Sequence, residues 1–187
     1  MTEIACTPGQ TVGPFFSLGL PYPGDSDLVG DGHPDAVRLH GTVYDGAGDP
    51  VSDALVELWQ PDGAGRIPRQ AGSLRRDGAT FTGWGRSATD AAGHYGFTTV
   101  APGSVDGAQP PFFAVAVFAR GLLHRLFTRA YLPNGDPHAD PLLAAVDAGR
   151  RATLVCVAES GCAGYRFDIH MQGPNETVFL AYRDDRR

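Results

Sequence analysis

The chain has 187 residues with a formal net charge of −6, and 25 glycines and 15 prolines punctuate it. A length of this order suits one domain, and the glycine and proline content favours short strands and turns over long helices. The acidic balance excludes nucleic acid as a partner, because phosphate backbones are bound by clustered lysine and arginine. No apolar run is long enough for a membrane span, and the first ten residues lack a basic and apolar leader, so we expect a soluble, cytoplasmic protein.

Residues 1–36 are predicted to form an irregular N-terminal arm. This segment is rich in glycine and proline and has no sustained hydrophobic period, yet it contains several large apolar side chains: Val12, Phe15, Phe16, Leu18 and Leu20. Such a segment cannot build its own core, so it is expected to lie on its own domain or on a neighbouring chain. These residues alone leave both surfaces open, and residues 37–187 are predicted to form the domain.

Strict alternation of apolar and polar residues first appears at residues 37–44, which are predicted to form a half-buried strand. A turn at residues 45–50 leads to residues 54–59, which we expect to be the antiparallel partner in a hairpin. Further strands of similar spacing are predicted at residues 81–84, 94–98, 112–118, 126–132, 152–158 and 165–172. The pattern predicts an all-β fold, an antiparallel β-sandwich of about eight short strands.

One short helix is expected after the sixth of these strands. Asp140 is a suitable N-cap, Pro141 suits the first helical turn, and Gly149 is expected to end the helix.

Residues able to carry chemistry do not form a recognisable set. None of the six histidines stands two or four residues from another, which is the spacing that brings two imidazoles to one metal from one element. The three cysteines have no metal-type spacing and are interpreted as reduced structural thiols. There is no nucleophile elbow and no phosphate loop. From these patterns alone the chain is a β-sandwich with an apolar arm.

Three longer stretches resemble the intradiol ring-cleavage dioxygenases, which act on catechols. They are LHGTVYDGAGDPVSDALVELWQPDGAGR, ATDAAGHYGFTTVAPG and YRFDIHMQGPNETVFL, flanked by TPGQTVGPFF and FARGLLHRLFTR. The resemblance runs from about Thr7 to Tyr182. It implies a mononuclear Fe(III) held by two tyrosines and two histidines, in the motifs A-G-R-Y, P-G-P-Y-P-W and R-P-x-H-x-H.

All four implied ligands are replaced in this sequence. Ile67 stands where the first motif has tyrosine, and Val105 where the second has it. Gln109-Pro110-Pro111 replaces the start of the third motif, and either nearby register of Phe113–Val117 puts apolar side chains at the histidine positions. Ferric iron needs phenolate, imidazole or similar donors. We therefore expect that this chain binds no iron, and that the hydrophobic replacements fill in a buried site that no longer works.

The resemblance implies a role shared with another chain. A partner beta subunit would supply Fe(III), and the active site would lie at the subunit boundary, where O2 and a catechol react. The arm residues Thr11, Gly13 and Pro14 are predicted to lie beside the substrate pocket of that partner. Arg120 is our candidate for binding a substrate carboxylate, because a guanidinium suits bidentate binding, with Arg125 and Arg129 as competitors.

Two alternatives remain open at this point. A non-catalytic β-sandwich binding module would explain the strands but not the arm. An independent metalloenzyme would need a ligand set that the sequence does not show. We expect a hetero-oligomer in which this chain alone is inactive.

Overall fold

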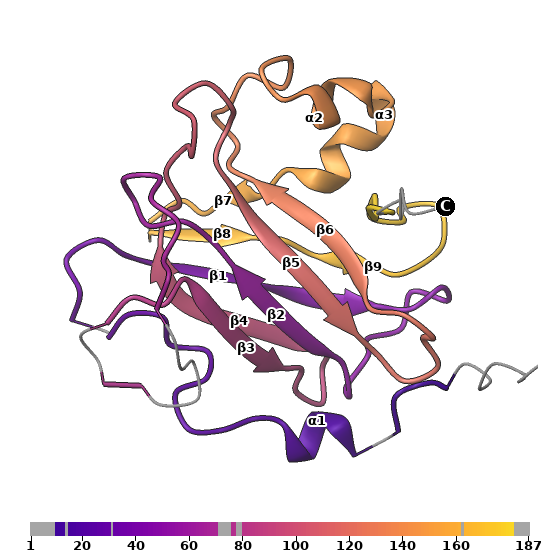
Figure 1. Ribbon diagram of the computed structural model, residues 1–187. Helices are drawn as coiled ribbons and strands as arrows, with labels where there is room; N and C mark the ends of the chain where they lie inside the picture. The colour runs from indigo at the N-terminus through magenta and orange to yellow at the C-terminus, as the bar shows by residue number, and fades with distance from the viewer. Residues whose placement is uncertain are drawn as a thin grey trace, which may run out of the picture.

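Two β-sheets packed face to face form the body of the protein, in a computed structural model that describes residues 10–13, 15–30, 32–70, 76–77, 80–161 and 163–181 (Figure 1). The first sheet has the order β4-β1-β8-β7, with β9 also pairing with β1, and the second has the order β3-β2-β5-β6. The strands are β1 (Ala36–Tyr44), β2 (Leu55–Trp59), β3 (Trp84–Ala88), β4 (His94–Val100), β5 (Phe112–Phe118), β6 (Leu126–Tyr131), β7 (Val157–Ala158), β8 (Gly164–Arg166) and β9 (Ile169–His170). The predicted sandwich is confirmed.

The core lies between the sheets and is built by the alternation read from the sequence. Leu39 and Val43 of β1 are fully buried, as are Phe113 and Val117 of β5. Burial of each such side chain contributes about 1.5–3 kcal/mol. The described residues include one free cysteine, Cys156, which is buried in this core, while Cys6 and Cys162 lie outside the described residues.

The predicted hairpin between residues 37–44 and 54–59 is wrong. The turn begins as expected, because the Asp45 carboxylate accepts hydrogen bonds from the backbone of Ala47 and Asp49, at 2.8 and 2.9 Å. However, β2 pairs with β3 and β5, whereas β1 pairs with β4, β8 and β9. The chain therefore crosses from one sheet to the other after the turn, and the two apolar strand faces stack across the core.

The predicted strand at residues 152–158 is also mostly wrong. The chain there forms α3 (Ala148–Arg151) and a single 3-10 turn at Ala152–Leu154, and only the short β7 follows. The Asp147 carboxylate accepts a hydrogen bond from the backbone N–H of Gly149 and caps α3, so Gly149 lies inside a helix. The predicted cap is confirmed, since the Asp140 carboxylate accepts from Leu142 and Leu143 at the start of α2 (Pro141–Ala145).

Residues 165–172, predicted as one strand, form the two short strands β8 and β9, which both run parallel to β1. The break lies at Phe167, whose carbonyl accepts the Tyr95 hydroxyl at 2.6 Å, and at Asp168, whose carboxylate accepts the backbone N–H of Thr42. The first sheet is therefore mixed. The strand predicted near residues 81–84 begins three residues later, as β3.

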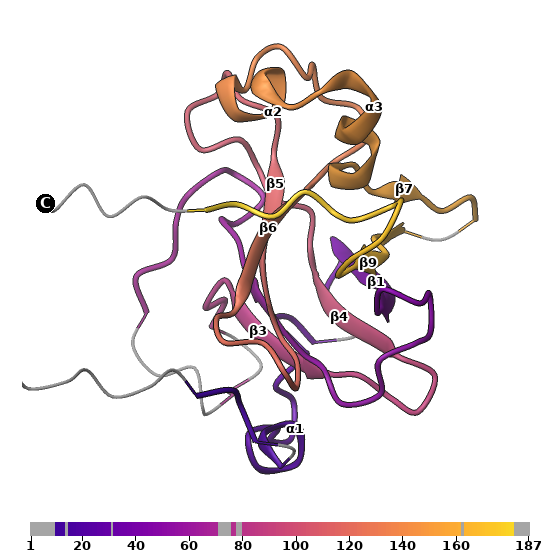
Figure 2. The same ribbon diagram turned by 90° about the vertical axis from the view of Figure 1, so that its right-hand side faces the viewer.

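The N-terminal arm divides into two parts. Residues near Leu28 belong to the domain: Leu28 and Val29 are buried, and the Leu28 N–H donates to the Thr98 carbonyl at 2.8 Å. The preceding helical turn, α1 (Phe16–Gly19), lies below the sandwich and buries no side chain (Figure 2). Phe15 and Leu18 are 74% and 77% exposed. Packing of this outer part on a partner stays a prediction.

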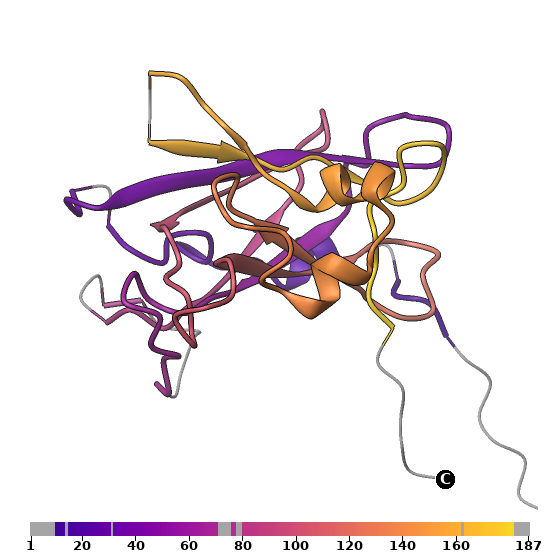
Figure 3. The same cartoon turned by 90° about the horizontal axis from the view of Figure 1, so that it is seen from above.

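The longest helix in the described part of the chain has five residues, and no helix there is long and apolar enough to cross a membrane. Seen from above, α2 and α3 lie over one end of the sandwich (Figure 3). The β5–β6 hairpin therefore has two different ends: the helices lie beside the start of β5, and the hairpin turn at residues 119–125 lies at the opposite end, next to the arm (Figure 1).

Candidate functional site

The loops that contain Ile67 and Val105 pack backbone against backbone. The Gly103 N–H donates to the Asp62 carbonyl at 2.9 Å, and the Asp62 carboxylate accepts from the backbone of Ala64 and Arg66, both at 2.9 Å. Gly65 has a φ of +82°, and a side chain there would collide with the Ser104 carbonyl. The two positions at which the resemblance implies tyrosine therefore lie in two loops that touch each other.

These two positions are not buried. Ile67 is 64% exposed and Val105 is 58% exposed. Val105 lines an open cavity of about 230 Å³ together with three prolines and an aromatic ring: Pro61, Pro110, Pro111 and Phe112. The expectation that hydrophobic side chains fill in a buried site is therefore wrong here, because the loops leave these side chains at the surface.

The outer face of β5 continues this site. The strand alternates, so Phe113, Val115 and Val117 face the core, while Phe112 and Ala114 face outward. When Gln109-Pro110-Pro111 is aligned with R-P-x, the two histidine positions fall on Phe112 and Ala114, so the register begins one residue before Phe113–Val117, the stretch expected from the sequence. Both line a groove of about 270 Å³ on the outer face of the second sheet, with Trp59, Ala116, Phe127, Thr128 and Arg129.

A charged network lies next to Phe112. The Arg129 Nη1 donates to Asp140 Oδ2 at 2.9 Å and to Tyr131 Oη at 3.1 Å, and the Tyr131 hydroxyl donates to the same Asp140 oxygen at 2.7 Å. Asp140 is 1% exposed. Burial, and next the hydrogen bond to Asp140, raise the pKa of Tyr131 to about 12. The guanidinium of Arg129 lies 4.2 Å from the centroid of the Phe112 ring.

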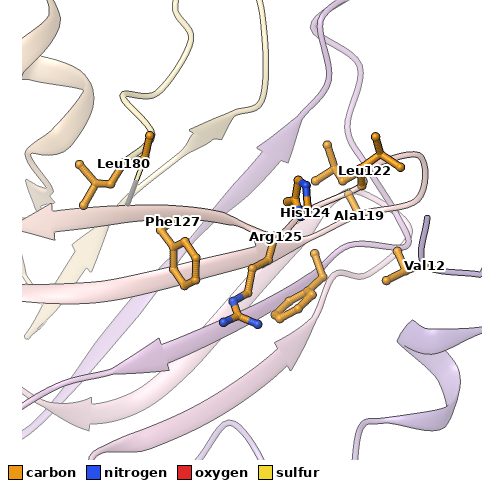
Figure 4. A pocket seen from close by; sticks show the side chains of 10 residues that line it. Val12, Ala119, Leu122, His124, Arg125, Phe127 and Leu180 are labelled. Atoms are coloured by element: carbon orange, nitrogen blue, oxygen red, sulfur yellow. The ribbon is translucent and has the colours of Figure 1, made fainter. Parts of the chain in front are cut away.

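A larger pocket lies at the other end of the hairpin, between the arm and the turn. It has a volume of about 660 Å³, and Val12 of the arm lines it opposite Ala119, Leu122 and Arg125 (Figure 4). Thr11 and Gly13, on either side of Val12, are exposed. Pro14 lies outside the described residues.

The three candidate arginines are separated by the structure. Arg120 is at the hairpin turn, 65% exposed, with its Nε 3.1 Å from Asp53 Oδ2. Arg125 lines the arm pocket and stacks 4.8 Å from the ring centroid of Phe127. Arg129 belongs to the Asp140 network. Arg120 and Arg125 therefore lie at the end of the arm, and Arg129 lies at the end of the former ligand positions.

A model of the Dioxygenase family matches residues 12–173. The protocatechuate 3,4-dioxygenase alpha chain of Burkholderia cepacia is 42% identical over 96% of this chain and 99% of its own length. The chain belongs to the intradiol dioxygenase family. The protocatechuate 3,4-dioxygenase beta chain of the same organism is 33% identical over 83% of this chain and 74% of its own length. The dioxygenase domain of a Streptomyces sp. SirexAA-E protein has the same fold, with a TM-score of 0.61, 24% identity, and coverage of 89% of this chain and 98% of that domain.

Intradiol dioxygenases use Fe(III), and the residues of this chain do not fit the ion. Isoleucine, valine, phenylalanine and alanine have no atom that donates an electron pair to ferric iron. Across the described residues, no group of three or more histidine, cysteine, aspartate or glutamate side chains could hold a metal. Among intradiol dioxygenases, this chain has the fold of the family without the donors that the resemblance implies at these positions.

Sequence reasoning missed Tyr131 and Asp140 as parts of this site. Asp140 was found only as a helix cap, because the pattern Asp-Pro before an apolar run signals that role. Its second oxygen binds Arg129 and Tyr131 of β6, and that contact depends on how α2 folds back over the sheet. The one signal in the sequence is the alternation of β6, which puts Arg129 and Tyr131 on the same face of the strand.

Proposed function

We propose that this chain is the alpha subunit of a protocatechuate 3,4-dioxygenase, that it binds no iron, and that a beta subunit supplies the Fe(III). The observation that carries the proposal is the 42% identity to an alpha chain over nearly the whole length. The missing donors at the four implied ligand positions support it. The assembled cytoplasmic enzyme would use O2 to cleave protocatechuate between its hydroxylated carbons, giving 3-carboxy-cis,cis-muconate.

In this proposal the arm of the chain closes one side of the active site of the partner. Apart from its two chain neighbours, no atom of the described residues lies within 4 Å of the place where a side chain at Gly13 would start. Nothing within the described chain therefore requires glycine there, whereas the close approach of a second surface or a substrate would. Thr11 offers a hydroxyl beside it, and Pro14 would add a rigid apolar wall.

Arg120 is proposed to bind the carboxylate of protocatechuate. Its Nε lies 3.1 Å from Asp53 Oδ2, the side chain is 65% exposed, and its two terminal nitrogens make no hydrogen bond among the described residues. A guanidinium in this state can still bind a carboxylate through Nη1 and Nη2. The position at the hairpin turn, on the same end of the molecule as the arm, supports the same boundary for both contacts.

The proposal is tested by expressing the chain alone and with a beta chain from the same organism. We expect the two chains to co-elute in size-exclusion chromatography and to cleave protocatechuate, whereas the chain alone is inactive. A chain that stays separate from the beta chain, and adds nothing to its activity, would contradict the proposal and favour the alternative of a non-catalytic binding module.

A further inference from the structure

We propose that the groove beside Arg129 binds an acidic side chain of the partner beta subunit. The Arg129 groove is the cavity on the outer face of the second sheet lined by Trp59, Phe112, Ala114, Ala116, Phe127 and Arg129. This inference rests on the proposed function, since it names the contact that this chain makes through its former ligand positions. A site for a metal would thus have become a site for a carboxylate.

The hydrogen bonds of Arg129 leave one side of its guanidinium available. Nη1 has two hydrogens, and Asp140 and Tyr131 accept them. Nε and Nη2 carry the remaining three hydrogens and have no partner among the described residues. These two nitrogens form the side-on edge that binds a carboxylate with two parallel hydrogen bonds. Stacking on Phe112 at 4.2 Å fixes the plane of the guanidinium, so this edge is already oriented.

The charges on this face also favour an acidic occupant. Asp140 balances the charge of Arg129 through Nη1 and leaves the Nε and Nη2 edge of the guanidinium unoccupied. Arg125, on the same side of the hairpin, contacts the Phe127 ring and has no carboxylate partner among the described residues. The nearby Arg86 is already paired with Glu57 at 2.7 Å. The face is therefore locally positive in a chain with a net charge of −6.

The side chains that line the groove are of the types that are common in protein interfaces. Trp59 is 54% exposed, and Phe112 and Phe127 are half-buried, on either side of a floor made by Ala114 and Ala116. Tryptophan, other aromatic residues and arginine are enriched where partner chains bind, and apolar walls that exclude water strengthen a charged hydrogen bond. An aspartate or glutamate of a covering chain fits these properties, because it would meet the free edge of Arg129 between aromatic rings.

The first test compares two arginine variants in the pair of chains. We expect Arg129→Gln to raise the dissociation constant of the alpha–beta pair by about 10–100-fold, the range for a lost hydrogen bond to a charged group. Arg166→Gln is the control, because it removes an exposed guanidinium from β8 of the first sheet, away from the Arg129 groove, and we expect less than about a threefold change. Equal effects of the two variants would overturn the inference.

A second test leaves Arg129 in place, in case its removal disturbs folding. Ala114 is directly opposite Arg129 in the β5–β6 register and faces the groove, so Ala114→Glu supplies a competing carboxylate. Ala114→Gln has the same size without the charge. We expect Ala114→Glu to weaken the pair about tenfold more than Ala114→Gln, and this difference to vanish in the Arg129→Gln background. The absence of any difference between the two variants in wild-type chain would overturn the inference.

Two further outcomes separate this inference from the proposed function. A pair that assembles, cleaves protocatechuate and is insensitive to all these variants overturns only the Arg129 groove, whereas the failure of the chains to pair overturns the proposed function. Benzoate is titrated onto the assembled pair as a free aromatic carboxylate. Binding of benzoate that is lost in Arg129→Gln would show an open groove for a small ligand and would overturn the partner side chain as its occupant. We expect no such binding.

Discussion

The two ends of the β5–β6 hairpin differ in how completely their charged groups are paired within the chain. At the end covered by α2, Asp140 accepts hydrogen bonds from Arg129, Tyr131 and the helix start, so its buried charge is satisfied within the chain. At the hairpin turn, Arg120 is exposed. In the N-terminal arm, Phe15 and Leu18 are also exposed to solvent. The first end stabilises the fold through Asp140 and leaves one edge of the Arg129 guanidinium open. The second end leaves a whole guanidinium and two large apolar side chains exposed.

The largest expected effect is at the covered end. Asp140→Ala removes a helix cap and leaves the Arg129 guanidinium without its buried partner, so we expect the free energy of unfolding to fall by about 3–5 kcal/mol. Urea denaturation of the isolated chain measures this. Tyr131→Phe keeps the carboxylate and the arginine, and should cost only about 1–2 kcal/mol. Equal, small losses would mean that this end is not held by Asp140.

The arm is expected to matter for assembly and much less for folding. Removal of residues 1–19 spares Leu20, whose carbonyl accepts a hydrogen bond from Arg86 at 3.1 Å. We expect the dissociation constant of the alpha–beta pair to rise about 100-fold, since one or two buried aromatic anchors carry this much energy. Val157→Ser is the control, because it changes an exposed apolar side chain in β7 of the first sheet. Unchanged assembly of the truncated chain would remove the arm from the interface.

Arg120, at the turn, is tested by comparing a substrate that has a carboxylate with one that has none. In the assembled enzyme, Arg120→Ala should raise KM for protocatechuate by a factor that corresponds to about 1.5–3 kcal/mol, and should leave turnover of catechol, which has no carboxylate, nearly unchanged. Asp53→Asn is the control for a purely structural ion pair. If Asp53→Asn and Arg120→Ala depress both substrates alike, Arg120 acts through the fold and does not bind the substrate.

The smallest effect concerns the core beneath the covered end. The Cys156 N–H donates to the Tyr131 carbonyl, and burial raises the pKa of the Cys156 thiol from 9.0 to about 12. The folded-state pKa lies above the unfolded value, so the stability contributed by the protonated thiol is full below pH 9 and is lost as the pH rises towards 12. Between pH 9 and 11 the wild-type chain should lose about 2 kcal/mol more than Cys156→Ala. The free energy of unfolding of both chains is measured by urea denaturation at each pH. An equal loss in the two chains would contradict the burial of the Cys156 thiol.

The sequence was sufficient for the strands whose alternation is strict. The bounds of β5 agree with the prediction, and β1, β2 and β6 differ by one residue at an end, because a period of two with one buried face leaves little freedom. The sequence did not predict which of the two sheets each strand joins. Whether β2 pairs with β1 or stacks on it depends on contacts with β4 and β5, which are far apart in the chain.

The candidate site shows the same limit. The missing iron donors are visible at Ile67 and Val105 by motif alone, but their exposure depends on how two loops pack against each other. Likewise, Arg129 and Asp140 are eleven residues apart in sequence, on a strand and at a helix start, and their ion pair exists only because α2 folds over the end of the sheet. Long-range contacts of this kind leave no local pattern.

The central claim is that this chain completes an iron enzyme without holding the iron. Elemental analysis of the isolated chain and of the assembled alpha–beta pair, together with the ring-cleavage activity of each, tests it most directly. We expect no stoichiometric iron and no activity in the isolated chain, and one iron per pair with cleavage of protocatechuate. An isolated chain that purifies with one iron atom and cleaves protocatechuate would contradict the account.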